Sequence, residues 1–337
     1  MASGGEVVNK RQYLKAIELL EKRVYGEFMD AIKARVNSAS IKDIQAGIVA
    51  QDINAIIESA GLTETDLTIV VETLRSGYLQ GAMANAEALS IQFGVTHKPT
   101  ADWLAAYSSA FVVEISETSR DAIKYIVSKG YEYGANPRAT ALDIVGRMVK
   151  GKGRVGGVVG LHEQFASYVD NARNELRDLN PNYLTRTRRD MRFDKMYERA
   201  LLSNTPLTQQ QIDAMSGYYS DQLLRLRGET IARTESMRAI SSGRHGAIEQ
   251  AIDRGEVHPD DIERVWSATM DSRTRESHAL MDKQAVRHDE PFVTPEGFSI
   301  MYPGDPNAPA AESIQCRCYE ITRINHIQAQ KRREGLI

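Results

Sequence analysis

The stretch from residue 227 to residue 319 constrains the possible fold most strongly. Polar residues stand there in dense groups, where a generic amphipathic helix would show only periodic apolar positions. Residues 227–243 have the pattern of a helix, with Ala232, Met237 and Ile240 available for burial. The polar residues that this helix carries are Arg233, Glu235 and Arg238.

A short strand is predicted after this helix, because Val265 and Trp266 are β-branched and aromatic and Ala268 follows them. Asp271 comes next, and its carboxylate can accept backbone N–H groups that have no partner in the first turn of a helix. The sequence therefore predicts a strand followed by a short helix that Asp271 caps.

The predicted short helix carries Arg273, Arg275 and His278, and the last two share a face because they are three residues apart. Cys316 and Cys318 alternate in a further predicted strand. Successive side chains of a strand point to opposite faces, so both thiols should face one side and the arginine between them the other. We expect one structural cluster, made of Arg233, Glu235, Trp266, Asp271, Arg273, Arg275, His278, Cys316 and Cys318.

This arrangement resembles the Mu F-like phage head morphogenesis family, the minor capsid protein family of tailed phages. The resemblance covers roughly the last third of the chain. It lies in the Arg-Thr-Glu helix, the segment from Trp266 to His278, a late Pro-Gly-Asp turn and the final Cys-Arg-Cys. In this family Asn often precedes Cys-Arg-Cys, whereas Gln315 stands there in this chain, and His288 has no place in the pattern.

The first third of the chain has the pattern of several helices. One apolar stripe steps by fours and threes, as on one face of a long helix. Its residues are Tyr13, Ile17, Leu20, Val24, Phe28 and Ala31. Ser40 can cap the next helix, and the Ala- and Gly-rich stretch around residues 77–88 permits close packing of a later one.

The fold class expected from these patterns is a mostly α N-terminal region followed by a small α+β C-terminal domain. The chain is long enough for two or three domains. The expected ranges are 1–135 for the helical N-terminal region, 136–226 for a helical, basic, Gly-containing connecting region, 227–325 for the Mu F-like α+β domain, and 326–337 for a flexible tail.

The glycine run from Lys150 to Gly160 invites comparison with a phosphate-binding loop. Such a loop needs Lys and then Ser or Thr after its last glycine, and it must follow a strand. Here Leu161 and His162 follow Gly160, and the segment before the run is predicted to be helical. We therefore interpret the run as a flexible loop.

Residues 136–199 form the only basic part of the chain, with 13 Lys and Arg against 8 Asp and Glu. Four arginines in it could contact nucleic-acid phosphates, namely Arg186, Arg188, Arg189 and Arg192. Asp190, Asp194 and Glu198 are interleaved with them and can form ion pairs instead. Salt bridges are the favoured interpretation, and DNA contact remains open.

The late cysteines and histidine raise the question of catalysis or metal binding. Sequence alone permits a Cys318–His278–Asp271 triad, but it shows no local signature of a nucleophile. Zinc prefers four tetrahedral ligands, and His278, Cys316 and Cys318 supply three, so Asp271 or His288 would have to complete the set. The favoured interpretation is a buried polar network without catalysis, metal or cofactor, in which the cysteines pack as small apolar groups.

Composition argues against a membrane span and gives no overall charge that favours nucleic acid. No apolar run approaches the roughly 18 residues of a membrane span, and the net charge is −3. Two cysteines suit a reducing compartment better than a disulfide scaffold. We therefore expect synthesis and assembly in the host cytoplasm, without membrane contact.

The family resemblance implies a structural protein of the virion and not an enzyme. A minor head protein of this kind would enter the procapsid near the portal, in several copies, and support head assembly or DNA packaging and ejection. Its partners would be the portal protein, the scaffold, the major capsid protein and the packaged DNA. The alternatives are a DNA-binding packaging or ejection factor and, less favoured, an enzyme that uses Asp271, His278 and Cys318.

Overall fold

The computed structural model describes residues 10–337, and in it the chain divides into two separately packed units. Among the described residues, the first unit takes in 10–25, 70–108 and 229–337. The second unit takes in 26–69 and 109–228. Each unit therefore draws on stretches that lie far apart in the sequence.

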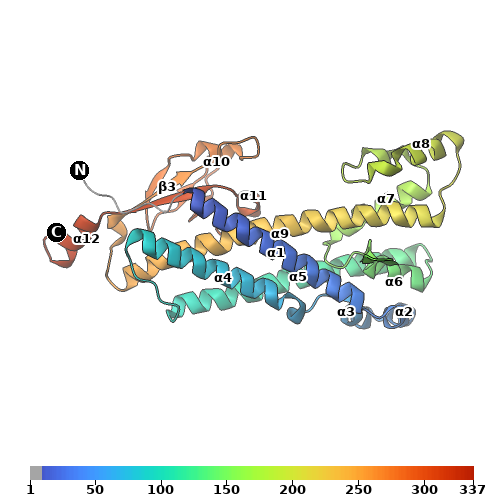
Figure 1. The fold of residues 1–337 in the computed structure, drawn as a ribbon, viewed down its shortest axis with the longest axis horizontal. Coiled ribbons are helices and arrows are strands. Elements are labelled where there is room, and N and C mark those ends of the chain that lie inside the picture. The colour runs from blue at the N-terminus through green and yellow to red at the C-terminus, as the bar shows by residue number, and fades with distance from the viewer. Residues whose placement is uncertain (1–9) are drawn as a thin grey trace. The chain divides into compact units, whose positions relative to one another are not determined.

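Long helices cross every junction between these stretches (Figure 1). They are α1 (Lys10–Ser38), α4 (Glu64–Leu89), α5 (Lys98–Glu132) and α9 (Gln209–Asp253). Because the junctions lie inside helices, the two units do not follow the contiguous ranges that the sequence patterns indicated. Among residues 10–337, no helix is both long and apolar enough to cross a membrane.

The apolar stripe predicted for the first helix is confirmed from Tyr13 to Phe28. Tyr13, Ile17, Leu20, Val24 and Phe28 are all buried along α1, at 4% exposure or less. Ala31 is only half-buried, and its neighbour Ile32 is buried instead. Steps of four and three residues keep these side chains on one face of a helix with 3.6 residues per turn. Burial of that face stabilises α1 more than the intrinsic helix propensity of its residues does.

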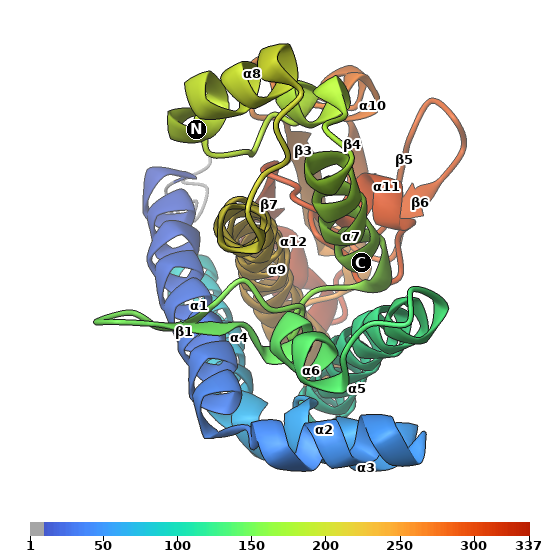
Figure 2. The same cartoon turned by 90° about the vertical axis from the view of Figure 1, so that its right-hand side faces the viewer.

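The second unit is helical apart from one hairpin. Its further elements are α2 (Ile41–Ala50), α3 (Ile53–Ala60), α6 (Pro137–Val145), β1 (Arg147–Val149), β2 (Gly153–Val155), α7 (Glu163–Arg177), the 3-10 turns η1 (Pro181–Thr185) and η2 (Met191–Phe193), and α8 (Asp194–Ser203). Ser40 caps α2 as predicted, by accepting from the backbone N–H of Asp43. The glycine run that we interpreted as a loop forms most of the antiparallel β1–β2 hairpin, which extends sideways from α6 (Figure 2).

The first unit carries the other strands, beside the C-terminal half of α9 (Figure 1). After α9 come the 3-10 turn η3 (Pro259–Asp261), β3 (Ile262–Ser267), α10 (Glu276–Leu280), β4 (Ala285–Arg287), β5 (Phe292–Val293), β6 (Ser299–Ile300), α11 (Ala310–Ser313), β7 (Tyr319–Ile324) and α12 (His326–Arg333). β3 pairs antiparallel with β4 on one side and with β7 on the other, and β5 pairs with β6. The predicted α+β character of this region is confirmed.

The last residues differ from the expected flexible tail, because they fold into α12. Ala329 in this helix is buried against a cluster that includes Leu89, Ile248, Val257 and Ile324. Asn325 caps the helix by accepting from the backbone N–H of Gln328. The sequence did not predict this contact, because the tail is mostly polar and Ala329 is the small apolar residue that packs against the cluster.

Glycines let α4 and α9 approach each other closely in the first unit. A Cβ atom on Gly81 would lie 2.3 Å from the carbonyl oxygen of Ile240, and one on Gly243 would lie 2.0 Å from the carbonyl oxygen of Tyr78. These separations are shorter than any non-bonded contact, so a side chain at either position would push the helices apart. The Gly-rich stretch of α4 therefore does what its composition predicted.

We predict that Gly243→Ala lowers the free energy of unfolding by about 1–3 kcal/mol, because overpacking outweighs the better helix propensity of alanine. Chemical denaturation of the purified chain measures this change. Gly26→Ala is the matched control, because Gly26 is also helical but a Cβ there would meet nothing within 4 Å. An equal loss of stability in both variants would contradict the close approach of α4 and α9.

Candidate functional site

A buried arginine lies at the centre of the C-terminal sheet. Alternation along β3 places Arg264 on the same buried face as Ile262 and Trp266. Its guanidinium is fully buried and lies 3.1 Å from the Glu320 carboxylate on β7. It also donates to the backbone carbonyls of Arg287, Glu290 and Met301, which join the β4 turn and the segment after β6 to the sheet.

A second buried arginine links this sheet to the helices. The guanidinium of Arg244, on α9, lies beside two neighbouring aromatic rings, 4.7 Å from the centre of Tyr13 and 4.8 Å from that of Tyr319. It donates to the carbonyl oxygen of Glu320 at 3.1 Å and to the side chain of Asn85 at 3.3 Å. Burial raises the pKa of Tyr13 to about 12, so its hydroxyl stays protonated and hydrogen-bonded within the unit.

The same network controls the charge of Glu320. Burial raises the pKa of this carboxyl. The positive charges of Arg264 and Arg244 lower it, and the pKa as a whole lies below its usual value. The hydroxyl of Thr322 also donates to the Glu320 carboxylate at 2.9 Å. Glu320 is therefore ionised and fully partnered, as a buried charge must be.

His278 and the two cysteines meet in the interior of the first unit. The Nδ1 atom of His278 lies 3.8 Å from Cys316 Sγ and 3.4 Å from Cys318 Sγ. All three side chains are buried, at 1–2% exposure. The thiols face one side and Arg317 the other, as predicted, although β7 begins only at Tyr319.

The second nitrogen of His278 faces a carboxylate that the sequence did not single out. Its Nε2 atom lies 2.9 Å from Glu312 Oε2, on α11, although the angle falls outside hydrogen-bonding range. The hydroxyl of Ser277 donates to the same oxygen at 3.0 Å. The ring of Trp266 packs edge-on against the imidazole, with ring centres 5.2 Å apart.

The two thiols titrate as a pair. A hydrogen bond from Cys318 lowers the pKa of the Cys316 thiol well below its usual value. The same bond raises the pKa of the Cys318 thiol, and burial raises it further. Cys316 is therefore the thiol that loses its proton first.

Asp271 does not cap the helix of His278, so that prediction was wrong. α10 begins at Glu276, and its N-cap residue is Arg275, which makes no capping bond with its side chain. Asp271 instead closes a turn by accepting from the backbone N–H of Arg273 at 2.9 Å, and it binds both terminal nitrogens of Arg317 at 2.5 Å. Residues that we expected in the first helical turn therefore form a separate turn before α10.

The remaining members of the expected cluster hold neighbouring elements together. Arg233 pairs with Glu21 on α1 at 3.0 Å, and Arg275 donates to the carbonyl oxygen of Ile314. Glu235 accepts from Arg238 at 2.9 Å and from the hydroxyl of Tyr107 on α5. Arg273, Arg275 and Arg317 also line a polar hollow together with Glu18 and Glu229. The cluster therefore mixes buried and surface groups, and it is not one continuous network.

His288 belongs to a second group, with His245 and Glu249 of α9. His288 Nε2 lies 2.6 Å from Glu249 Oε1, and the two imidazole rings stack with centres 4.7 Å apart. Burial lowers the pKa of His245 to about 3, and the neighbouring His288 and Arg264 lower it in the same direction. His245 is therefore neutral at physiological pH.

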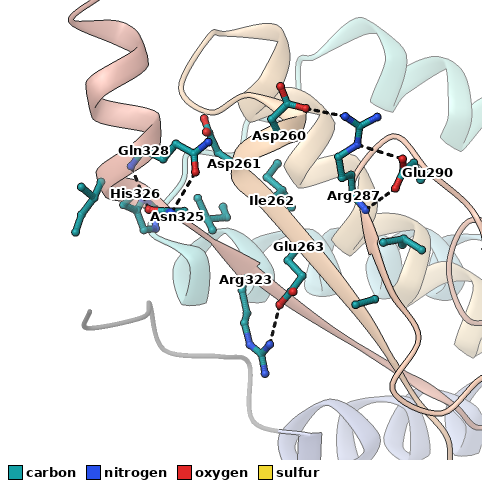
Figure 3. Close-up of a pocket in the computed structure, with 14 residues that line it drawn as sticks. Asp260, Asp261, Ile262, Glu263, Arg287, Glu290, Arg323, Asn325, His326 and Gln328 are labelled. Carbon is teal, nitrogen blue, oxygen red and sulfur yellow. Dashed lines mark hydrogen bonds and ion pairs between the residues drawn. The ribbon is translucent and has the colours of Figure 1, made fainter. Parts of the chain in front are cut away.

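A surface pocket lies over the sheet, lined by β3, β4, β7 and α12 (Figure 3). Arg287 pairs there with Asp260 at 3.0 Å and with Glu290 at 3.2 Å. Arg323 pairs with Glu263 across the strands at 2.8 Å. Both arginines of the pocket are therefore engaged in ion pairs with carboxylates that line it.

The arginines of the basic middle segment are largely engaged within the second unit. Arg186 binds both oxygens of Glu175, and Arg189 binds both oxygens of Asp194. Arg192 pairs with Asp190 at 2.6 Å. These are the salt bridges that the interleaved charges predicted, except that Glu175 is a more distant partner. DNA contact by Arg186, Arg188, Arg189 and Arg192 is the alternative to these salt bridges.

Sequence reasoning missed the buried partners of the cluster. A signal existed for Arg264, because strict alternation places it on the buried face of β3 with Ile262 and Trp266. The same alternation places Glu320 between the buried residues Cys318 and Thr322. No pattern pointed to Glu312, which lies in a helix of four residues.

Comparison with known proteins identifies the C-terminal part of the chain. Residues 195–321 match the family described as phage Mu protein F like protein. No solved structure shows a significant match to the chain.

Two curated relatives show what the chain is similar to. It is 32% identical over 97 residues to the minor head protein GP7 of Bacillus phage SPP1, which is 29% of this chain and 30% of that protein. It is 34% identical over 105 residues to the NAD(+)–arginine ADP-ribosyltransferase EFV of Enterococcus faecalis, which is 31% of this chain and 20% of that protein. The chain thus spans less than a third of the length of either relative.

We predict that Asp271→Asn lowers the melting temperature at neutral pH and that the difference from wild type disappears in acid. Hydrogen bonds from Arg317 and from the backbone of Arg273 hold the pKa of the Asp271 carboxyl below its usual range. A carboxylate with a lowered pKa stabilises the folded state above its unfolded pKa of about 4, and this contribution is lost as the pH falls through the folded pKa. Asparagine keeps the turn acceptor but removes the charge.

Melting curves between neutral pH and acid measure this difference. Asp289→Asn is the control, because Asp289 is exposed and its carboxylate lies 3.5 Å from its arginine partner. A difference for Asp271→Asn that is independent of pH would refute the proposed charge contribution.

Proposed function

We propose that this chain is a minor head protein of a tailed phage, incorporated into the procapsid near the portal, and that it acts by binding and not by catalysis. The observation that carries this proposal is the match of residues 195–321 to the phage Mu F-like family. The similarity to a protein named minor head protein supports it. In this role the chain would support head assembly or the packaging and ejection of DNA.

The burial of the reactive side chains supports binding over catalysis. His278, Cys316 and Cys318 are at most 2% exposed, so a substrate would reach the thiols only after the unit opened. The triad permitted by the sequence also lacks its third member, because Asp271 is held by Arg317 and Glu312 stands beside His278 instead. A catalytic nucleophile needs access as well as a base.

The name of the second relative motivates the competing proposal, an enzyme that transfers ADP-ribose to arginine. The chain covers only 20% of that protein, which leaves most of the named enzyme without a counterpart in the matched stretch. Transfer of label from NAD to an arginine acceptor by the purified chain would contradict the proposal that this chain acts by binding alone.

The proposed partners are the portal protein, the scaffold and the major capsid protein of the same phage. The chain would lie in the interior of the virion, in more than one copy, after assembly in the host cytoplasm. These partners come together in the assembled head, and the test therefore compares whole particles.

We predict that the chain co-sediments with procapsids when it is expressed together with its cognate portal, scaffold and capsid proteins. Particles assembled without the portal are the control, because they separate portal-dependent incorporation from contact with the capsid wall. We expect incorporation to fall strongly in those particles. A chain that sediments with neither isolated portal nor complete procapsids would eliminate the proposed role.

We predict that the basic middle segment gives no submicromolar DNA binding at about 150 mM salt, because phosphate contacts weaken steeply with salt and the ion pairs already occupy three of its arginines. A mobility-shift assay measures this. Tight binding that Arg188→Glu abolishes, while Lys195→Glu on α8 leaves it intact, would favour the DNA-binding alternative. Lys195→Glu is matched because it makes the same charge change at an exposed position nearby.

A further inference from the structure

The group formed by His278, Cys316 and Cys318 has the chemistry and the geometry of a metal site. We propose that these three side chains bind a zinc ion that ties α10 to the segment before β7. This departs from the expectation of a metal-free network, and it does not depend on the proposed function in the phage head.

The distances within the group fit a tetrahedral zinc ion. Zinc lies about 2.3 Å from a cysteine sulfur and about 2.0 Å from a histidine nitrogen, so neighbouring ligand atoms are roughly 3.5–3.8 Å apart. The Nδ1 atom of His278 lies 3.8 Å and 3.4 Å from the two sulfurs. All three ligand atoms lie within 4.8 Å of one another, so an ion needs only small side-chain adjustments to enter.

The surroundings of His278 match those of a metal-bound imidazole. A histidine that binds a metal through one nitrogen usually presents the other to a carboxylate, which fixes the ring and makes the ligand nitrogen more basic. Here Nδ1 faces the sulfurs while Nε2 lies 2.9 Å from Glu312 Oε2. The hydroxyl of Ser277 holds that carboxylate in place from the same side.

Both sulfurs are buried, at 1–2% exposure. The ring of Trp266 packs against His278 beside them, and its buried indole N–H makes no hydrogen bond within residues 10–337. N–H donors near sulfur ligands stabilise them. A divalent cation supplies the positive charge that two buried thiolates require.

The role of this ion is structural. Three protein ligands leave one tetrahedral position for a solvent molecule, an arrangement that zinc enzymes also use. The ligands are buried, so no substrate has direct access to that position. The ion would instead join α10 to the chain just before β7, two pieces separated by about forty residues of turns and short strands.

The group of His245, Glu249 and His288 is the natural comparison, because it also brings potential ligands together. Its imidazole planes lie within 22° of parallel, so the lone pairs of the two rings do not converge on one point. The charge of Arg264 also acts on His245 and opposes a cation there. This group therefore serves as a matched control for the zinc site.

The experiment uses the full chain, expressed in zinc-supplemented medium and purified without a metal-affinity column. Elemental analysis should find about one zinc per chain in the wild type. Cys316→Ser and His278→Ala should lose the ion, whereas His288→Gln should keep it. Removal of zinc with a chelator should lower the melting temperature and expose the thiols to a thiol reagent.

Two further measurements keep the test valid if the ligand variants fail to fold. Replacement of zinc by cobalt in the wild type should give the strong charge-transfer absorption of cobalt–thiolate bonds. Glu312→Gln should keep the ligands and the fold but bind zinc about 10–100-fold more weakly, because its carboxylate only positions the imidazole. Glu249→Gln, which alters the comparison group in the same way, should leave the affinity unchanged.

A wild-type chain without stoichiometric zinc, whose thiols react equally fast with and without added zinc, would overturn the proposal. Loss of the ion in His288→Gln but not in Cys316→Ser would also overturn it, by moving the metal to the other group.

Discussion

The buried ion pair between Arg264 and Glu320 is the interaction on which the first unit depends. Arg264 reaches one carboxylate and three backbone carbonyls, so a single side chain joins β3, β4, β7 and the segment after β6. Removal of one partner from such a pair typically costs about 3–5 kcal/mol, because the other charge is left buried without compensation. Arg244 continues the network from the Glu320 carbonyl to Tyr13 on α1. The helices and the sheet are therefore parts of one polar framework.

This framework also positions the candidate metal ligands. Trp266 pairs with Glu320 in the register of β3 and β7, and its ring packs against His278. Cys318 stands two residues before Glu320, so a sulfur ligand lies directly before the strand that carries the ion pair. These groups face one another in the interior of the unit and are buried from solvent. The site is built for cohesion, which is consistent with a protein whose proposed work is assembly.

Much of this architecture follows from local patterns, and the remainder depends on long-range packing. The stripe from Tyr13 to Phe28, the strand at Trp266 and the common orientation of the two thiols were predictable because each reflects a helical or strand period. The actual role of Asp271 was not predictable, because its carboxylate pairs with Arg317, which lies 46 residues away in the sequence. The contact between His278 and Glu312 was not predictable either, because these residues are also far apart in the sequence. Family resemblance identified the C-terminal module without revealing these contacts.

The discontinuous make-up of the first unit has a consequence for synthesis on the ribosome. Tyr13 bonds to Ser241, 228 residues later, and Lys10 to Ser267, 257 residues later. The N-terminal end of α1 must therefore wait for these partners until most of the chain has been made. Contacts of such sequence separation form slowly, and a nascent apolar helix is prone to association with other chains in the interval. Temporary cover for α1, by a chaperone or by a neighbouring assembly protein, would be most valuable while the chain is still being made.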